Sequence, residues 1–116
     1  MWRVEFTNEF EEWWNGLSQE QQERIDVAIE HLEEKGPGLG RPLVDTIEGS
    51  KVPNLKELRV GTIRILFVFD PRRTAILLLG ENKSERWAEC YEEAIPEAER
   101  LYEEYLSELR KEGLIE

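Results

Sequence analysis

Cysteine and histidine are almost missing from this chain. Cys90 is the single cysteine among 116 residues, which excludes an internal disulfide and a cysteine-based zinc cluster. His31 is the single histidine, so a Ser-His-Asp or Cys-His catalytic group has no support, and we expect His31 on a solvated helix surface. The acidic residues show no spacing typical of metal ligands. We therefore predict no metal and no cofactor, and a reducing compartment, the cytoplasm.

Long apolar runs are missing as well. The longest, around residues 63–69 and 75–79, are far shorter than the about 20 residues that cross a bilayer. The first residues lack the basic and apolar pattern of a secretory leader. We predict a soluble chain without a targeting signal or membrane association. Its length suits one domain, residues 1–116, built around a single core.

Positive charge is scarce overall but concentrated in the middle of the chain. The 15 basic and 26 acidic residues give a net charge of -11, which on average repels a polyanion such as a nucleic acid. Residues 41–86 nevertheless hold nine basic and six acidic side chains, a balance of +3, and the remainder totals -14. This distribution predicts a basic face on an acidic molecule. The alternative is that the helices are simply rich in glutamate.

Apolar periodicity predicts a strand and two helices in the first third of the chain. Residues 2–6 alternate between apolar and polar side chains, which is typical of a strand with one buried face. A capping residue at position 7 or 8 begins a first helix, which ends at Gly16. A capping-box pattern at residues 18–21 begins a second helix that ends at residues 36–37. Two consecutive helices predict an antiparallel helical hairpin.

Three strands and a long helix complete the predicted fold. The strands span residues 55–60, 62–70 and 74–80. Before them lie a loop at 36–42 and a short extended piece at 44–47. The strand at 62–70 is apolar on both faces, so helices must cover both faces of the sheet. An amphipathic helix follows from residue 84, which Pro96 should kink or divide. The fold class is α+β: a small antiparallel sheet in the order strand, helix, helix, strand, strand, strand, helix, with the N-terminal helical hairpin and the long C-terminal helix packed on it.

Two arginines are predicted to face each other across a hairpin. If residues 61–62 form a two-residue loop, Arg59 pairs with Arg64 on one face of the sheet. Opposed guanidinium groups repel unless an anion lies between them. An RNA phosphate would satisfy both groups, and the alternative is that Glu57 or a glutamate of the last helix neutralises them. Lys56 falls on the opposite face by strict alternation, unless a bulge turns it.

Further cations follow the last strand. Lys83 and Arg86 are expected near the edge of the sheet, where the N-terminus of the following helix also favours an anion. Trp87 can stack on a nucleobase, although a place in the core is the alternative that we favour. A patch of permanently charged groups suits a reaction whose transition state gathers negative charge at phosphorus. Strand scission by the 2′-hydroxyl group of RNA is such a reaction.

Several blocks of sequence together carry a resemblance to a known family. The segments LKELR at 55–59, IRILF at 63–67 and FDPRR at 69–73, with the flanking stretches 36–42 and 85–91, resemble HigB-type toxins of the RelE/ParE superfamily. The resemblance covers residues 2–106. It implies a compact antiparallel sheet flanked by helices and an endoribonuclease that cuts mRNA on the ribosome without a metal. It also implies inhibition by a cognate antitoxin, for which we expect a helix-turn-helix protein.

The resemblance implies that Lys56, Arg59, Arg64, Arg72 and Lys83 hold the phosphate and promote the attack of the 2′-hydroxyl group, and the other predicted site residues are neighbouring cations and Trp87. The predicted catalytic residues are Lys56, Arg59, Arg64 and Lys83, and the predicted RNA-binding residues are Arg72, Arg73, Arg86 and Trp87. In these roles Arg59 and Arg64 would bind the scissile phosphate, and Lys83 or Lys56 would move protons or stabilise the leaving oxygen.

Departures from the family pattern leave an alternative function open. Relatives often have glycine, aspartate and a second tryptophan where this chain has Glu81, Asn82 and Cys90. The alternative is a protein of the same fold with attenuated or no cleavage, which acts by binding an antitoxin, gyrase or another protein.

Overall fold

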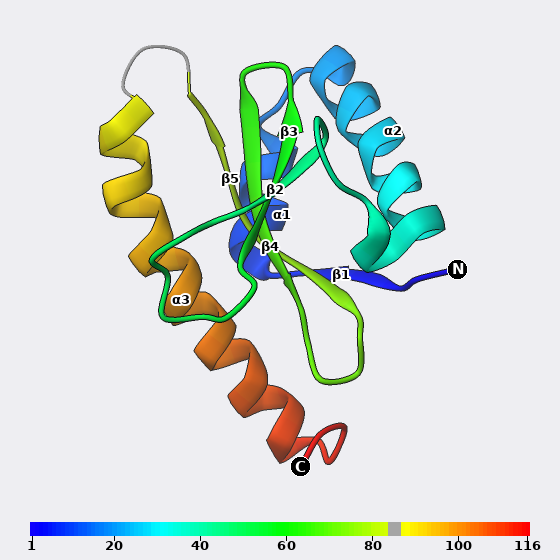
Figure 1. Cartoon of the computed structure of the whole chain (residues 1–116), viewed down its shortest axis with the longest axis vertical. Coiled ribbons are helices and arrows are strands. Elements are labelled where there is room, and N and C mark those ends of the chain that lie inside the picture. The colour runs from blue at the N-terminus through cyan, green and yellow to red at the C-terminus, as the bar shows by residue number, and fades with distance from the viewer. Residues whose placement is uncertain (84–86) are drawn as a thin grey trace.

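The chain folds into one five-stranded sheet with helices on both faces (Figure 1). The computed structural model describes residues 1–83 and 87–116, apart from the side chains of residues 87–90. In chain order the elements are β1 (Val4–Phe6), α1 (Asn8–Asn15), α2 (Gln19–Lys35), a 3-10 turn (Gly36–Gly38), β2 (Val44–Thr46), β3 (Lys56–Val60), β4 (Ile63–Phe69), β5 (Ala75–Asn82) and α3 (Trp87–Lys111). Among the described residues, no helix is long and apolar enough to cross a bilayer.

The strand order in the sheet is β1-β5-β4-β3-β2. The three pairs from β2 to β5 are antiparallel, whereas β1 pairs with β5 in parallel. The predicted α+β class, the helical hairpin and the C-terminal helix are confirmed. The sheet is mixed rather than wholly antiparallel, because β1 joins the far edge beside the last strand instead of beside the next strand in sequence. The extended piece expected at 44–47 is the edge strand β2.

Side-chain caps begin the helical hairpin as predicted. The Thr7 hydroxyl oxygen accepts a hydrogen bond from the Phe10 backbone N–H at 3.0 Å, and the hydroxyl group donates to the Leu78 carbonyl at 2.7 Å. The second contact ties the start of α1 to β5. Ser18 and Gln21 form the reciprocal capping box at the start of α2. Each helix therefore begins directly after its capping residue, Thr7 for α1 and Ser18 for α2.

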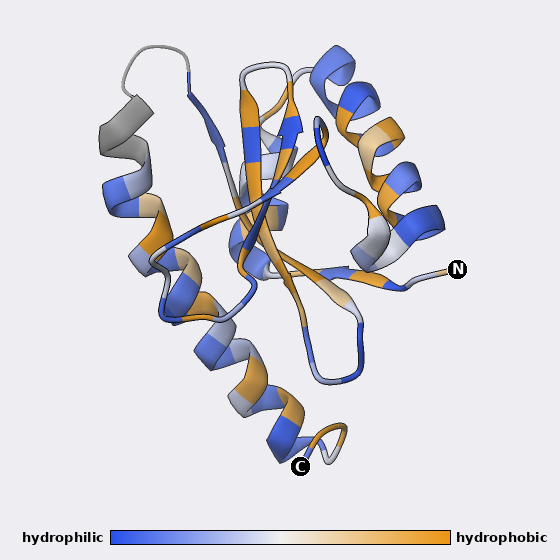
Figure 2. Cartoon of the chain, viewed as in Figure 1, coloured by the Kyte–Doolittle hydropathy of each residue, from blue (hydrophilic) through white to orange (hydrophobic). Residues whose placement is uncertain are grey.

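The central strand β4 is covered on both faces. Ile63, Ile65 and Phe67 belong to the cluster beneath α1 and α2, whereas Leu66 and Val68 belong to the cluster beneath α3. In Figure 2 the hydrophobic residues of α3 lie on its side toward the sheet. The helix α3 is a single helix that contains Pro96, so of the two expected effects of this proline, a kink or a division, the division is absent. Each apolar face of β4 therefore packs against a layer of helices, and this packing fixes the position of β4 in the sheet.

An irregularity in β5 changes which residues face each helix layer. Leu66 pairs with Leu79 but Phe67 pairs with Leu77, so Leu78 is an extra residue, as in a β-bulge. Beyond it, Gly80 pairs with Ile65 beneath α1. A Cβ atom at Gly80 would lie 2.3 Å from the ring of Trp13, so glycine allows the indole to pack directly on the backbone.

We predict that Gly80→Ala lowers the free energy of unfolding by about 1–3 kcal/mol, because the added methyl group displaces the Trp13 ring from the sheet. Urea unfolding measures the change. The matched control is Gly40→Ala, since a Cβ atom at Gly40 meets nothing within 4 Å. Equal stability of the two variants would contradict the packing described for Trp13.

Candidate active site

The β3–β4 hairpin brings Arg59 and Arg64 directly opposite each other. Gly61 has φ of 62°, a left-handed conformation that glycine adopts without strain, and the hairpin turns at Gly61 and Thr62. The Cα register pairs Arg59 with Arg64 and Val60 with Ile63. The predicted juxtaposition is therefore confirmed.

The anion between these arginines is the carboxylate of Glu57. Its Oε2 atom lies 3.2 Å from Arg59 Nε, and its Oε1 atom lies 3.5 Å from Arg64 Nε. The Glu57 side chain is only 1% exposed. Two alternatives were predicted for the opposed arginines, a bound phosphate or neutralisation by a glutamate, and in this structure Glu57 neutralises them. The carboxylate occupies the place expected for an RNA phosphate.

The two arginines differ in exposure and in their other partners. The Arg59 side chain is 36% exposed, and its Nη2 atom also lies 3.2 Å from Asp45 Oδ2 of β2. The Arg64 side chain is 14% exposed and donates hydrogen bonds to the carbonyl groups of Gly61 and Ile63. Arg64 is thus fixed to the hairpin turn, and Arg59 is the more accessible of the two cations.

A tyrosine of α3 completes the contacts of Glu57. The Tyr91 hydroxyl group donates a hydrogen bond to Glu57 Oε1. Burial raises the pKa of Tyr91 above its ordinary value, and the hydrogen bond to Glu57 raises it further, so the phenol keeps its proton and remains a donor. Tyr91 was not among the predicted site residues, although it lies within the amphipathic helix predicted from residue 84. One feature of the sequence pointed to such a partner: strand alternation places the acidic Glu57 on a sheet face that a helix covers, where a carboxylate needs a hydrogen-bond donor.

Glu57, Arg59 and Tyr91 open onto a shallow cleft of about 410 Å³. The cleft is also lined by Thr46, Ile47, Glu48 and Ile95. Its volume lies at the lower end of the range of about 300–1,000 Å³ typical of small-molecule sites. Glu57 lies in the closed floor of this cleft, because its side chain is only 1% exposed, so a chain that enters the cleft meets the more accessible Arg59 first.

Lys83 lies at the end of β5 beside the arginine pair. Its backbone N–H donates to the Thr62 carbonyl oxygen at 2.9 Å, and its side chain shares a small hollow with Arg64 and Tyr91. Burial lowers the pKa of Lys83, and the positive charges of Arg64 and Arg59 lower it further against the opposing effect of Glu57. This ammonium group therefore gives up a proton more readily than an ordinary lysine does.

The charges around this site do not add up to a positive face. Among the described residues, the cations of the region are Arg41, Arg59, Arg64 and Lys83, and the acids include Asp45, Glu48, Glu57, Glu81 and Glu93. The expected basic face is thus a mixture of cations and at least as many acids at this end of the sheet. Burial and then the charge of Glu93 raise the pKa of Glu81, which favours its neutral form. The balance shifts toward positive charge where Glu81 takes up a proton.

The structure does not bring the other predicted site residues to this cluster. Lys56 pairs with Phe67, so its side chain leaves β3 on the opposite face of the sheet, as strict alternation required, and its Nζ atom lies 3.5 Å from the hydroxyl oxygen of Thr46 on the edge strand β2. Arg72 follows the far end of β4, about 17 Å along the strand from Arg64. It pairs there with Asp70 and Glu5 at 2.7 and 2.9 Å.

Arg73, Arg86 and Trp87 are the remaining predicted RNA-binding residues. The Arg73 guanidinium lies 5.0 Å from the centre of the Trp2 ring, beyond the same far end of β4. Arg86 lies outside the described residues, and so does the side chain of Trp87. The expected surface position of His31 is confirmed, because this residue is exposed on α2.

Comparison with known proteins decides the family. Residues 12–103 match the family described as phage derived protein Gp49-like (DUF891). The chain is 46% identical over 99 residues to HigB3 of Mycobacterium tuberculosis strain H37Rv, which is named as a toxin, with coverage of 84% of this chain and 87% of HigB3. The chain belongs to this family of HigB-type toxins. It is also 50% identical over 101 residues to HigB2 of the same organism, which is likewise named as a toxin. This match covers 83% of this chain but only 50% of HigB2, so the chain spans about half the length of HigB2.

Solved structures show that this HigB-type chain has the RelE fold. The isolated RelE toxin of E. coli superposes with a TM-score of 0.61 at 16% sequence identity, and the match covers 83% of this chain and 97% of RelE. The RelE of Pyrococcus horikoshii OT3, solved in complex with RelB, gives 0.61 at 17% identity over 72% of this chain and 97% of that chain. At these identities the likeness concerns the fold alone.

We predict that Glu57→Gln lowers the free energy of unfolding by about 3 kcal/mol, because it leaves two guanidinium groups together without their shared carboxylate. This is the lower end of the cost of a broken buried ion pair, since Arg59 is partly exposed. Urea unfolding at neutral pH measures it.

The control for this prediction is Glu48→Gln, an exposed acid that lines the same cleft, with an expected change below about 0.5 kcal/mol. A loss smaller than about 1 kcal/mol for Glu57→Gln would contradict the central position given to its carboxylate.

Proposed function

We propose that this HigB-type chain is the toxin of a toxin–antitoxin pair and that it cuts mRNA on the ribosome without a metal. The observation that carries the proposal is the Glu57 carboxylate, held between Arg59 and Arg64 beside Tyr91 at the floor of a cleft of about 410 Å³. This set combines a proton acceptor with cations that can stabilise a phosphorane-like charge. These are the groups that attack by a 2′-hydroxyl group requires.

In the proposed reaction Glu57 accepts the proton of the 2′-hydroxyl group. The 2′-oxygen then bonds to phosphorus, and the bond between phosphorus and the 5′-oxygen breaks. Lys83 donates a proton to this leaving oxygen, in keeping with the lowered pKa of its ammonium group. The products are a 2′,3′-cyclic phosphate and a 5′-hydroxyl group. Arg59 neutralises the non-bridging oxygens during the reaction.

Arg64 and Tyr91 act as positioning residues in this mechanism. Arg64 is held by two carbonyl groups of the hairpin, and it and Tyr91 both contact Glu57 Oε1. Among the described residues, Arg59 is then the one cation in ion-pair contact with Glu57 Oε2. Oε2 is therefore the oxygen we assign as the proton acceptor.

RNA binding on this proposal requires Arg59 to exchange a carboxylate for a phosphate. Its pair with Asp45 is partly exposed, with side chains 36% and 25% accessible, and exposed pairs contribute only about 0–1 kcal/mol. A phosphate can displace such a contact at little cost. The buried Arg64 pair need not move, so Glu57 stays in place.

An antitoxin is the proposed protein partner. The RelE neighbours from Pyrococcus horikoshii and Methanococcus jannaschii were both solved as complexes with RelB, and the second is described as an antitoxin–toxin complex. These complexes support an antitoxin for this HigB-type chain, and we expect a protein of the helix-turn-helix type. We place the pair in the cytoplasm, where ribosome-bound mRNA is available.

The lack of net positive charge at the site favours a second candidate function. Both arginines already have carboxylate partners, and the cluster holds at least as many acids as cations among the described residues. A protein with this site but no cleavage would act by binding a protein target such as gyrase. Growth arrest without new RNA ends is the outcome specific to this candidate.

Induced expression in a bacterial host tests the two candidates. We expect growth arrest with mRNA cut at mapped 5′-hydroxyl ends, and we expect Arg59→Ala and Glu57→Gln each to lower the cleavage rate by about 100-fold or more. Amounts of folded protein are matched by circular dichroism. The control is Arg110→Ala, an exposed arginine in the last turn of α3. Arrest that persists in the Arg59→Ala variant without cleavage would contradict the nuclease.

The role given to Lys83 predicts a pH dependence. A general acid works only while it is protonated, so the cleavage rate should fall as pH rises through the pKa of Lys83, below the 10.5 of an ordinary lysine. In Lys83→Arg the alkaline fall should disappear, because a guanidinium group keeps its proton, although the rate at neutral pH is lower. A purified cleavage assay across pH measures both. If the cleavage rate of Lys83→Arg still falls at high pH as in the wild type, a group other than Lys83 is the general acid.

A further inference from the structure

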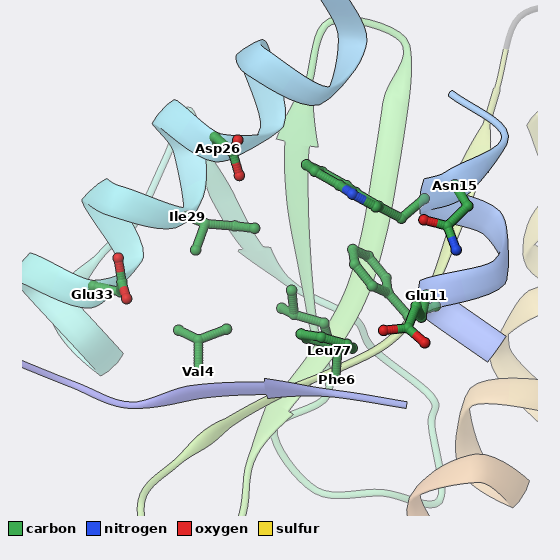
Figure 3. A pocket seen from close by; sticks show the side chains of 10 residues that line it. Val4, Phe6, Glu11, Asn15, Asp26, Ile29, Glu33 and Leu77 are labelled. Carbon is green, nitrogen blue, oxygen red and sulfur yellow. The ribbon is translucent and has the colours of Figure 1, made fainter. Parts of the chain in front are cut away.

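A second hollow lies on the other face of the sheet, between the helical hairpin and the edge strand β1 (Figure 3). Its volume is about 390 Å³, and we call it the hairpin groove. It is lined by Val4, Phe6, Phe10, Glu11, Trp14, Asn15, Asp26, Ile29, Glu33 and Leu77. Phe10 and Leu77 belong to the core cluster beneath α1 and α2, which is separated by the sheet from the cluster beneath α3. The hairpin groove is thus remote from the Glu57 cleft.

The floor of the hairpin groove is apolar and incompletely covered. Phe10 and Leu77 are buried, but Phe6 of β1 is 49% exposed, one of few large apolar side chains in the described part of the chain that are so open. Its ring lies 6.1 Å from that of Phe10, so it extends the core surface outward. Figure 3 shows Val4, Phe6, Ile29 and Leu77 around the hollow. An apolar floor of this kind favours apolar side chains of a partner.

The two sides of the hairpin groove are acidic. Glu11 stands on α1, and Asp26 and Glu33 stand on α2 across the hollow (Figure 3). None of these three carboxylates forms an ion pair within the part of the chain that the structure describes. The hairpin at residues 8–35 holds nine acidic and two basic side chains, a net charge of -7. This surface repels RNA and attracts a cationic partner.

We propose that the hairpin groove binds an amphipathic segment of the antitoxin, with apolar side chains on the Phe6 and Leu77 floor and Lys or Arg beside the acids. The inference rests on the proposed toxin–antitoxin function. Because the groove and the Glu57 cleft lie on opposite faces of the sheet, this segment anchors the antitoxin without touching the reacting groups. Retention of the antitoxin and inhibition of cleavage are therefore separable by mutation.

The test uses the full chain and, as the probe, the purified protein encoded by the gene adjacent to its own. The groove variant is Asp26→Lys with Glu33→Lys, and the control is Glu30→Lys, an exposed acid of α2 outside the groove lining. We expect the groove variant to bind the probe at least about tenfold more weakly in calorimetric titration and to lose most of the salt dependence of binding. Phe6→Ser should weaken binding to a similar degree.

A second readout is growth arrest. Toxin with the groove variant should arrest growth even when the probe protein is co-expressed, whereas the wild type and Glu30→Lys should be neutralised. Its cleavage rate without the probe should match that of the wild type, which separates lost docking from a damaged nuclease.

Three results would overturn the inference. Equal binding of the probe by the groove variant and the control removes the groove as an antitoxin site and leaves the proposed function intact. Failure of the wild type to bind the probe or be neutralised by it counts against the toxin–antitoxin function itself. Loss of self-association in place of probe binding, seen by sedimentation, assigns the groove to a contact between copies of the chain.

Discussion

The buried carboxylate of Glu57 determines how this end of the sheet is built. Two guanidinium groups placed opposite each other by the β3–β4 register repel strongly unless an anion separates them. Glu57 lies two residues before Arg59 on β3, so strand alternation places all three side chains on one face. Tyr91 of α3 then binds the same carboxylate. The arrangement couples the packing of the last helix to the geometry of the cations.

The apolar core explains why this polar cluster can persist. Leu66 and Val68 of β4 and Ala94 and Ala98 of α3 form one dry layer, which holds α3 against the sheet next to Glu57. A slip of β4 by one residue would turn the charged Arg64 into the apolar layer beneath α1 and α2, so the register that opposes the arginines is strongly specified. The same division of the sheet into two faces separates the Glu57 cleft from the hairpin groove, and gives one small domain two surfaces of different chemistry.

Local sequence patterns predicted the fold class and the arginine pair, but they did not predict contacts between residues far apart in the chain. Gly61 and Thr62 determined the hairpin, and the alternation of β3 placed Lys56 on the other face. The choice between a phosphate and Glu57 depended on how α3 docks, which alternation within a strand does not reveal. Of the two partners of Arg72, Asp70 is a near neighbour in sequence, but Glu5 lies in β1, 67 residues earlier in the chain, so this second pairing could not be read from neighbouring residues. The parallel contact of β1 with β5 is a similarly long-range feature.

The central claim is that RNA engages Arg59 while Glu57 and Arg64 remain paired. The most direct measurement is a titration of the protein with an uncleavable RNA that has a 2′-deoxy nucleotide at the cut site, followed by the Nε–H signals of the arginines in NMR spectra. A large saturable shift of the Arg59 signal, with the Arg64 signal kept near its starting position and protected from solvent exchange, is predicted. Signals of both arginines that do not respond to the RNA would contradict the account.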